Sequence, residues 1–236
     1  MIHSRQFEVE ELSINELEVS KTNPRFIQTV LNEEFAIAEL INLETKKMIK
    51  LTRSVLEKGM LPLTFYCFRE NGKIVLADGN RRLTVLKILQ RPELIPNNAK
   101  TRELIKICEE AKGFSFSEKF PCIIYEKWSD ELFDILNSLH VTDESKSDWT
   151  PLAQYRMSSR HGGNKHAWMK SLLCYFDNDK VDVMTNRKAD VYRRMFDAIK
   201  SIKIDIADSG ELLTKNAKEK LEKVNRLIRN DVVNTR

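Results

Sequence analysis

Hydrophobic and polar residues alternate through the first part of the chain and then change to a helical period. The alternation over 7–19 predicts one or two short strands, which end at the turn signal of residues 21–25. Over 33–58 the period predicts a long amphipathic helix that ends at Gly59. The positions that share this helical spacing are Ile37, Leu40, Ile41, Glu44, Met48, Leu51 and Val55.

Short strands and helices follow one another up to residue 139. The Asn71-Gly72 pair predicts a hairpin, with strands over 63–69 and 73–78. The second strand leads through Asp78-Gly79 into a helix. The elements expected after this strand are a helix over 80–90, a loop over 91–98, a helix over 99–112, a strand over 120–125 and a helix over 129–139.

Beyond residue 140 the strand pattern disappears. Helices are predicted over 150–161, 164–176, 187–202 and 211–230. We therefore predict the fold class α+β, with a small mixed sheet and helices over 1–140 and an all-helical domain over 141–236. The basic clusters at 156–170 and 187–194 point to DNA binding by the helical domain, and for the first cluster a solvated helix face is an equal alternative. The alternating charges over 211–230 point to a solvent-exposed or oligomerising helix.

Composition narrows the class of protein. The chain has 236 residues, of which 42% are hydrophobic and 31% charged, as in ordinary globular proteins. No apolar run approaches the roughly 18 residues that cross a bilayer, and the N-terminus lacks the apolar core of a signal peptide. We therefore expect a cytoplasmic protein without a membrane partner. The four cysteines are too widely spaced for a metal site and are expected to be reduced.

The strand-to-helix junction at Asp78-Gly79-Asn80 carries the clearest chemistry. A glycine lets the backbone turn without a Cβ clash, and the first N–H groups of the helix that follows have no intrahelical partner. These groups and the positive end of the helix dipole attract anions. Arg81 and Arg82 on the first turn add charge and a fork that matches phosphate, so the junction is predicted to hold a phosphate group. The alternative is an ordinary turn with two surface ion pairs.

Three short motifs resemble those of one known family. Gly79-Asn80-Arg81-Arg82 resembles the nucleotide-binding motif of the ParB/sulfiredoxin-like family, a glycine, one variable residue and two arginines at a helix start. Asn23-Pro24-Arg25 resembles the family's upstream box, and residues 139–153 resemble its third box. The resemblance covers residues 7–155. It is closest to a ParB-like subgroup with a Gly-Asn-Arg-Arg-Leu core, not to chromosome-partition ParB itself.

The resemblance implies a ParB/sulfiredoxin-like fold for the first domain and a nucleoside triphosphate, ATP or CTP, as its ligand. Gly79 and Asn80 would contact the phosphates through their backbone, and Arg81 and Arg82 through their side chains. Arg25 would close over the phosphates or order the site. Sulfiredoxin-type chemistry needs a cysteine in the glycine-arginine motif, and this sequence has none there.

The third box departs from the family pattern. Thr142, Asp143 and Lys146 stand where partition ParB carries a Glu-Asn pair and an arginine. Asp143 is the candidate Mg²⁺ ligand, since hard cations take carboxylate oxygens, and Lys146 is a candidate phosphate contact. His140 is a candidate general base, with helix capping or packing as the alternative.

Three functional hypotheses remain open from the sequence. The first is a ParB-like nucleotide-binding regulator that acts with DNA, a second copy of itself or a partner protein, in phage defence or a mobile-element system. The second is an enzyme, an NTPase or ParB-like nuclease, with Asp143 and His140 as catalytic residues and Asp78 nearby. A scaffold with a vestigial motif is a third hypothesis. The missing Glu-Asn pair favours binding over hydrolysis.

Overall fold

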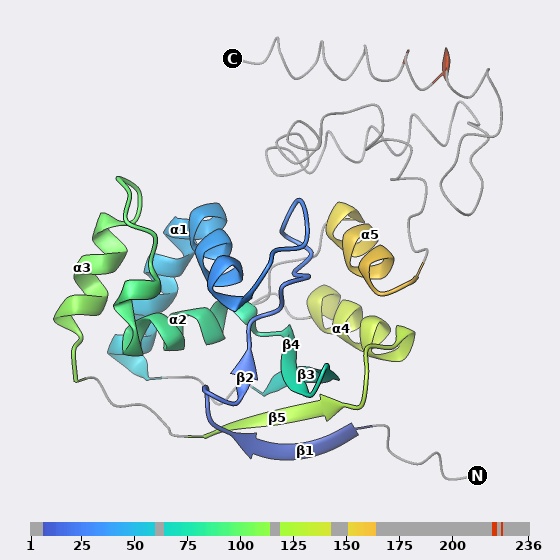
Figure 1. The fold of residues 1–236 in the computed structure, drawn as a ribbon, viewed down its shortest axis with the longest axis horizontal. Helices are drawn as coiled ribbons and strands as arrows, with labels where there is room; N and C mark the ends of the chain where they lie inside the picture. The colour runs from blue at the N-terminus through green and yellow to red at the C-terminus, as the bar shows by residue number, and fades with distance from the viewer. Residues whose placement is uncertain are drawn as a thin grey trace. The chain divides into compact units, whose positions relative to one another are not determined.

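The computed structural model describes residues 7–59, 64–113, 119–142 and 151–163, together with 219, 220 and 223. The chain divides into two compact units, residues 1–143 and 144–236 (Figure 1). In the second unit, helix α5 (Pro151–Arg160) matches the helix predicted over 150–161. The helices predicted over 164–176 and 187–202 lie outside the described residues, and of the one predicted over 211–230 only 219, 220 and 223 are described, each as helical. No helix among the described residues is long and apolar enough to span a membrane.

A mixed sheet of five strands forms the centre of the first unit. The strands are β1 (Phe7–Leu12), β2 (Leu17–Glu18), β3 (Phe65–Glu70), β4 (Lys73–Asp78) and β5 (Phe120–Tyr125), in the spatial order β1-β5-β3-β4-β2. The pairs β1–β5 and β3–β4 are antiparallel, whereas β3–β5 and β2–β4 are parallel. The small mixed sheet predicted for this unit is therefore confirmed.

The hairpin between β3 and β4 turns where the sequence predicts it. Asn71 and Gly72 have φ angles of 51° and 75°, so both central residues adopt the left-handed conformation that a two-residue hairpin turn of type I′ requires. Asparagine tolerates this conformation better than other side chains, and glycine adopts it freely. The turn brings β4, and the junction that follows it, back along β3.

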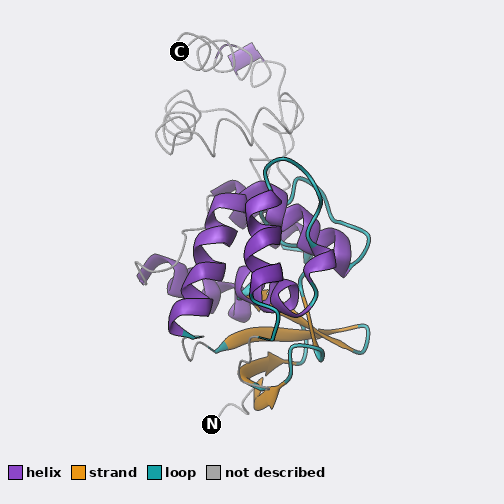
Figure 2. Cartoon of the chain, turned by 90° about the vertical axis from the view of Figure 1, so that its left-hand side faces the viewer, coloured by secondary structure: helices purple, strands orange, loops and turns teal. Residues whose placement is uncertain are grey.

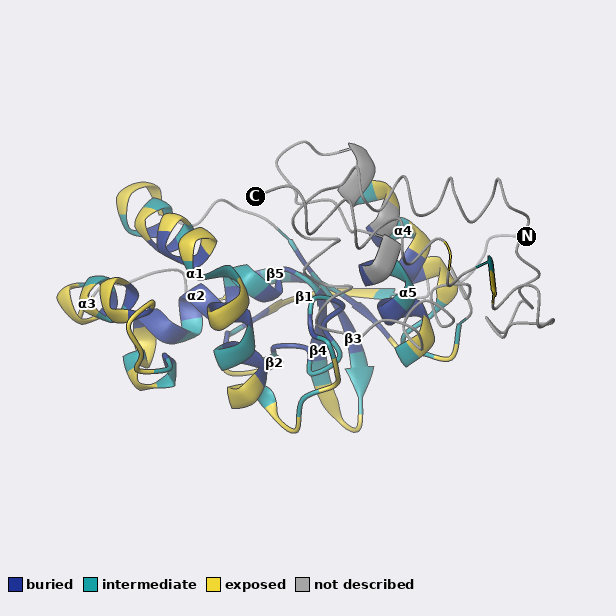
Figure 3. Cartoon of the chain, turned by 90° about the horizontal axis from the view of Figure 1, so that it is seen from above, coloured by how far each residue is buried: buried dark blue, intermediate teal, exposed yellow. Residues whose placement is uncertain are grey.

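Helices cover the sheet. Figure 3 shows α1 (Glu33–Lys58), α2 (Asn80–Gln90) and α3 (Arg102–Glu110) on one side of the strands and α4 (Asp130–Thr142) on the other. Figure 2 shows helices packed over the strands. A short 3₁₀ turn, Pro92–Leu94, joins α2 to the segment before α3. Strands β2, β3 and β4 and helices α1 and α2 contribute fully buried side chains to the core between them, including Leu17, Leu40, Ile41, Phe65, Leu76, Leu83 and Leu86. On the opposite side Trp128 meets Phe68 and Phe133 with ring centroids 5.5 and 6.5 Å apart.

Helix α1 has the predicted bounds and one feature that the sequence pattern does not predict. The Asn32 side chain caps its start by accepting a hydrogen bond from the Phe35 N–H at 2.9 Å, and Gly59 ends it. Within the helix, Glu44 leaves helical geometry, with φ −128° and ψ 31°. The helix is therefore kinked at this glutamate.

The cysteines that the structure describes are free thiols. Cys67, Cys108 and Cys122 are buried and form no disulfide, as the sequence predicts, and burial raises the pKa of Cys108 to about 11. A thiol with so high a pKa is almost wholly protonated at neutral pH. All three cysteines lie fully buried in the hydrophobic core, where they serve as small apolar side chains.

Candidate functional site

Gly79 forms the junction between β4 and α2. Its backbone has φ 93° and ψ 7°, a left-handed conformation that side chains disfavour. A Cβ atom built there would lie 2.5 Å from Cδ1 of Phe65. Both conformation and contact therefore require glycine. The N-cap residue is this glycine, so no N-cap side chain hydrogen-bonds the first-turn N–H groups of α2. Anion binding by these groups stays a prediction.

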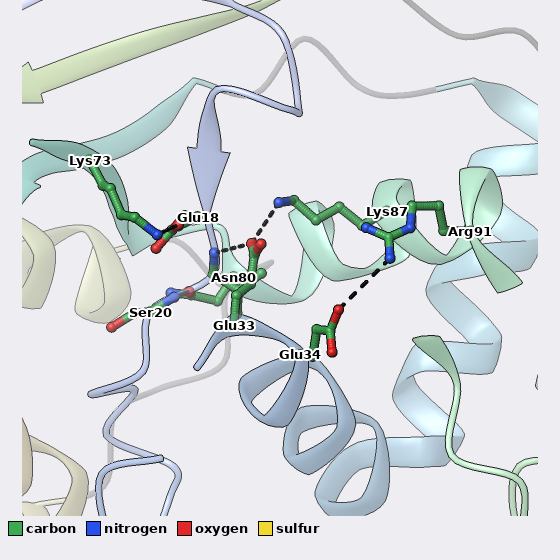
Figure 4. Close-up of polar contacts among 9 residues, drawn as sticks. Glu18, Ser20, Glu33, Glu34, Lys73, Asn80, Lys87 and Arg91 are labelled. Atoms are coloured by element: carbon green, nitrogen blue, oxygen red, sulfur yellow. Dashed lines mark hydrogen bonds and ion pairs between the residues drawn. The ribbon is translucent and has the colours of Figure 1, made fainter. Parts of the chain in front are cut away.

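The Asn80 side chain joins the start of α2 to the segment after β2. Its Oδ1 accepts a hydrogen bond from the Ser20 N–H at 2.8 Å, and its Nδ2 donates to the Leu76 carbonyl at 3.4 Å. Figure 4 shows Asn80 beside Ser20, with Glu33 and Lys87 nearby. Glu33 Oε1 accepts from both the Lys87 ammonium and the Val19 N–H. The side chain of Asn80 is therefore occupied, while its backbone remains at the helix start.

We expect Asn80→Ala to lower the free energy of unfolding by about 2 kcal/mol, because it leaves the buried Ser20 N–H without an acceptor. Urea denaturation measures the change, and hydrogen exchange at the Ser20 amide locates it. Asn42→Ala is the matched control, since Asn42 is exposed and, within the described part of the chain, its side chain bonds the side chain of Asn98 alone, at 3.3 Å. Equal losses in the two variants would contradict the anchoring role.

The Asn23-Pro24-Arg25 box is a turn that holds Arg25. The Asn23 Oδ1 accepts a hydrogen bond from the Arg25 N–H at 3.0 Å, and the Phe26 N–H donates to the Asn23 carbonyl at 3.0 Å. Phe26 is fully buried and fixes the turn to the core. Arg25 is therefore carried by a hydrogen-bonded turn that is attached to the core through Phe26.

Arg25 and Arg81 converge on one carboxylate. Each Nε lies 3.5 Å from Oε2 of Glu44, and the two arginine side chains are 20% and 25% exposed. The other oxygen of Glu44 accepts a hydrogen bond from Lys47 at 2.8 Å. Burial acts to raise the pKa of Glu44, but Arg25, Lys47 and Arg81 lower it below its ordinary value. The carboxylate is therefore ionised at neutral pH.

Arg82 points into the fold. Its Nη2 donates to the Thr64 carbonyl at 3.5 Å and lies 3.9 Å from Oδ2 of Asp78, and its guanidinium carbon lies 5.1 Å from the centre of the Phe65 ring. Burial lowers the pKa of Arg82, while Asp78 acts to raise it. Its Nη1 is buried without a hydrogen-bond partner. The contact of Arg82 with a phosphate stays a prediction.

The residues predicted from the third box are not placed. Asp143 and Lys146 lie outside the described residues, and the backbone of His140 and Thr142 belongs to α4 while their side chains lie outside them. Within the described part of the chain, no three histidine, cysteine, aspartate or glutamate side chains gather as a metal site. Mg²⁺ at Asp143 and catalysis by Asp143 and His140 stay predictions.

Glu44 is the site residue that the sequence analysis missed. A signal for it exists, because Glu44 shares the spacing of the apolar positions of α1. A carboxylate in such a series has to find a cation inside the fold. The sequence offers many cations, and only the fold shows that Arg25 and Arg81 are the ones that meet it.

No family model matches the chain, and no curated protein does. Nine chains of solved structures match, among them the C-terminally truncated chromosome-partitioning protein ParB from Caulobacter crescentus complexed with CTP-gamma-S. The two chains are 15% identical, the match covers 91% of this chain and 99% of that one, and the TM-score is 0.30. A TM-score this low carries no argument.

Proposed function

We propose that residues 1–143 form a nucleotide-binding module in which the first turn of α2 receives the phosphates of a nucleoside triphosphate. One observation carries the proposal: Arg25 and Arg81, from separate parts of the chain, converge beside the uncapped start of α2. Uncapped helix N-termini and arginine forks both favour phosphate oxygens. ATP and CTP are the candidate ligands.

The terminal nitrogens of the Arg25 and Arg81 guanidinium groups are available to a phosphate. The ion pairs of both arginines with Glu44 involve Nε, and among the described residues no hydrogen bond from their terminal nitrogens is observed. A guanidinium can bind two phosphate oxygens through its terminal nitrogens while Nε is engaged elsewhere. Arg25 and Arg81 are therefore the phosphate contacts that we propose, and Gly79 and Asn80 contribute backbone N–H groups.

The charges of this group also favour an anion. Among the described residues, Arg25, Arg81 and Lys47 all pair with the single carboxylate of Glu44, and Arg82, next to Arg81 in the sequence, pairs with Asp78. Excess positive charge therefore remains in a partly buried setting, where screening by solvent is weaker than at an open surface. The positive end of the α2 dipole adds to it.

Titration of the full chain with ATP, CTP and GTP, with and without Mg²⁺, tests the proposal. We expect at least one nucleotide to bind and Arg81→Ala to weaken its binding about tenfold, as expected for loss of one charge-assisted contact. Arg53→Ala is the matched control, because Arg53 is an exposed arginine that pairs with exposed Glu103. Nucleotide binding that is absent from wild type, or equal in wild type and Arg81→Ala, would refute the site.

We also propose, on sequence alone, that the module acts as a regulator with DNA, a second copy of itself or a partner protein, in phage defence or a mobile-element system. The basic segments on which DNA binding rests lie mostly outside the described residues. No contact among the described residues favours NTP hydrolysis or nuclease activity, so binding is the function that we propose. Phosphate release or DNA cleavage lost in Asp143→Ala would support the enzyme instead.

A further inference from the structure

The Glu44 carboxylate already occupies the place of an anion between the two arginines. Its Oε2 is the atom that both Nε groups approach, and the side chain is only 12% exposed. Since the neighbouring cations keep Glu44 ionised, the site holds a resident negative charge. An incoming phosphate therefore meets arginines that already have a counter-ion.

The ion pairs between the Glu44 carboxylate and the two arginines are weak. Charge-assisted N–H···O bonds are about 2.7–2.9 Å long, whereas both Oε2 distances are 3.5 Å. The Oε2 atom is also buried without a hydrogen bond. A buried carboxylate oxygen that lacks one is poorly stabilised. Phosphate oxygens in direct contact with the same forks would form the stronger interaction.

Glu44 has a second partner on its own helix. Its Oε1 accepts a hydrogen bond from Lys47 at 2.8 Å, and Lys47 is half exposed. The kink of α1 is at Glu44 itself, and the Thr45 hydroxyl bonds the Ile41 carbonyl at 2.7 Å beside it. Since Lys47 already holds one oxygen of Glu44, a rotation about the side-chain torsions is enough to move the other oxygen away from the arginines.

We propose that Glu44 is the resident counter-ion of the phosphate site and that a bound polyphosphate replaces it at Arg25 and Arg81. The displaced carboxylate then stays with Lys47. This inference rests on the proposed function and deepens it by naming the ligand class. A single carboxylate offers Arg25 and Arg81 no more than Glu44 does, whereas a di- or triphosphate brings several oxygens and charges. The site therefore selects polyphosphates over small monoanions.

Calorimetric titration of the full chain with inorganic tripolyphosphate tests the inference. We expect Glu44→Gln to bind tripolyphosphate about tenfold more tightly than wild type, because the ligand no longer competes with a like charge a few ångströms away. Glu103→Gln is the matched control, since it removes one exposed carboxylate paired with Arg53 and should leave the affinity unchanged. Acetate should not compete measurably with tripolyphosphate in wild type.

The outcomes separate the inference from the function on which it rests. If wild type binds tripolyphosphate and Glu44→Gln binds it equally or more weakly, the counter-ion role is overturned while the phosphate site stands. If neither protein binds it, both the inference and the proposed site fail. Binding that is measurable only in Glu44→Gln supports both.

A second variant tests the same exchange if Glu44→Gln does not fold. Lys47→Met removes the partner that receives the displaced carboxylate, so we expect tripolyphosphate to bind several-fold more weakly than to Lys46→Met. Lys46 is an exposed lysine beside Lys47, which makes the loss of long-range charge similar in the two variants. Equal affinities in Lys47→Met and Lys46→Met would overturn the transfer to Lys47.

Discussion

Gly79→Ala is expected to lower the free energy of unfolding of the first unit, residues 1–143, by about 3 kcal/mol or more. A side chain in the left-handed region costs on the order of 1 kcal/mol or more, and the new Cβ would lie 2.5 Å from the Phe65 ring. Phe65 is fully buried in the core, so the ring cannot move away freely. Overpacking of this kind adds about 1–3 kcal/mol.

Gly72→Ala separates the two costs. Gly72 also has a positive φ, 75°, but a Cβ there would meet no atom within 4 Å. We therefore expect Gly72→Ala to lose only the conformational part, about 1 kcal/mol. Hydrogen exchange of the β4 and α2 amides would measure both changes within this unit. If Gly79→Ala costs no more than Gly72→Ala, the close approach of Phe65 does not constrain the junction.

The elements of the first unit are predictable because their signals are local. The Asn71-Gly72 pair fixes a hairpin turn through the φ angles of two adjacent residues. Helix α1 starts and ends where Asn32 and Gly59 satisfy its terminal groups, and the apolar series between them sets its buried face. Each of these interactions spans a few residues, so a short stretch of sequence contains the information.

The order of the strands is not predictable in the same way. Phe7 pairs with Tyr125 across the antiparallel β1–β5 contact, far away in the chain, and β3 pairs in parallel with β5. Periodicity shows that a strand buries one face, but not which strand lies beside it. Side-chain packing of the whole sheet decides that choice.

The candidate site also has a part that local sequence predicts and a part that depends on long-range contacts. The glycine turn and the arginine pair are visible as a motif, and their placement at the start of α2 is confirmed. The different directions of Arg81 and Arg82 are not visible, since they depend on Glu44 in α1 and on Phe65 and Thr64 near β3. The sequence motif does not distinguish the two arginines. In the fold, Arg81 lies beside the Glu44 carboxylate, whereas Arg82 packs against Phe65 and Thr64.

Replacing Arg25 with glutamate is expected to weaken nucleotide binding at least a hundredfold. The substitution removes one of the two forks that converge beside α2 and places a second carboxylate next to that of Glu44. Repulsion between these carboxylates and a triphosphate adds to the lost contact, and the partial burial of the group limits screening by salt. Arg25→Ala should lose only the contact and weaken binding about tenfold.

Arg53→Glu makes the same change of charge at an exposed position of α1 and should alter the affinity less than twofold at physiological salt. Titrations with a fluorescent nucleotide measure the affinities of wild type, Arg25→Ala, Arg25→Glu and Arg53→Glu. Because Arg25 lies in a turn far from Gly79 in sequence, a graded loss from Arg25→Ala to Arg25→Glu cannot arise from the glycine-arginine motif alone. Such a graded loss requires the turn at Asn23 and the start of α2 to form one site. If Arg25→Glu leaves the affinity unchanged, any bound nucleotide contacts α2 without the turn at Asn23.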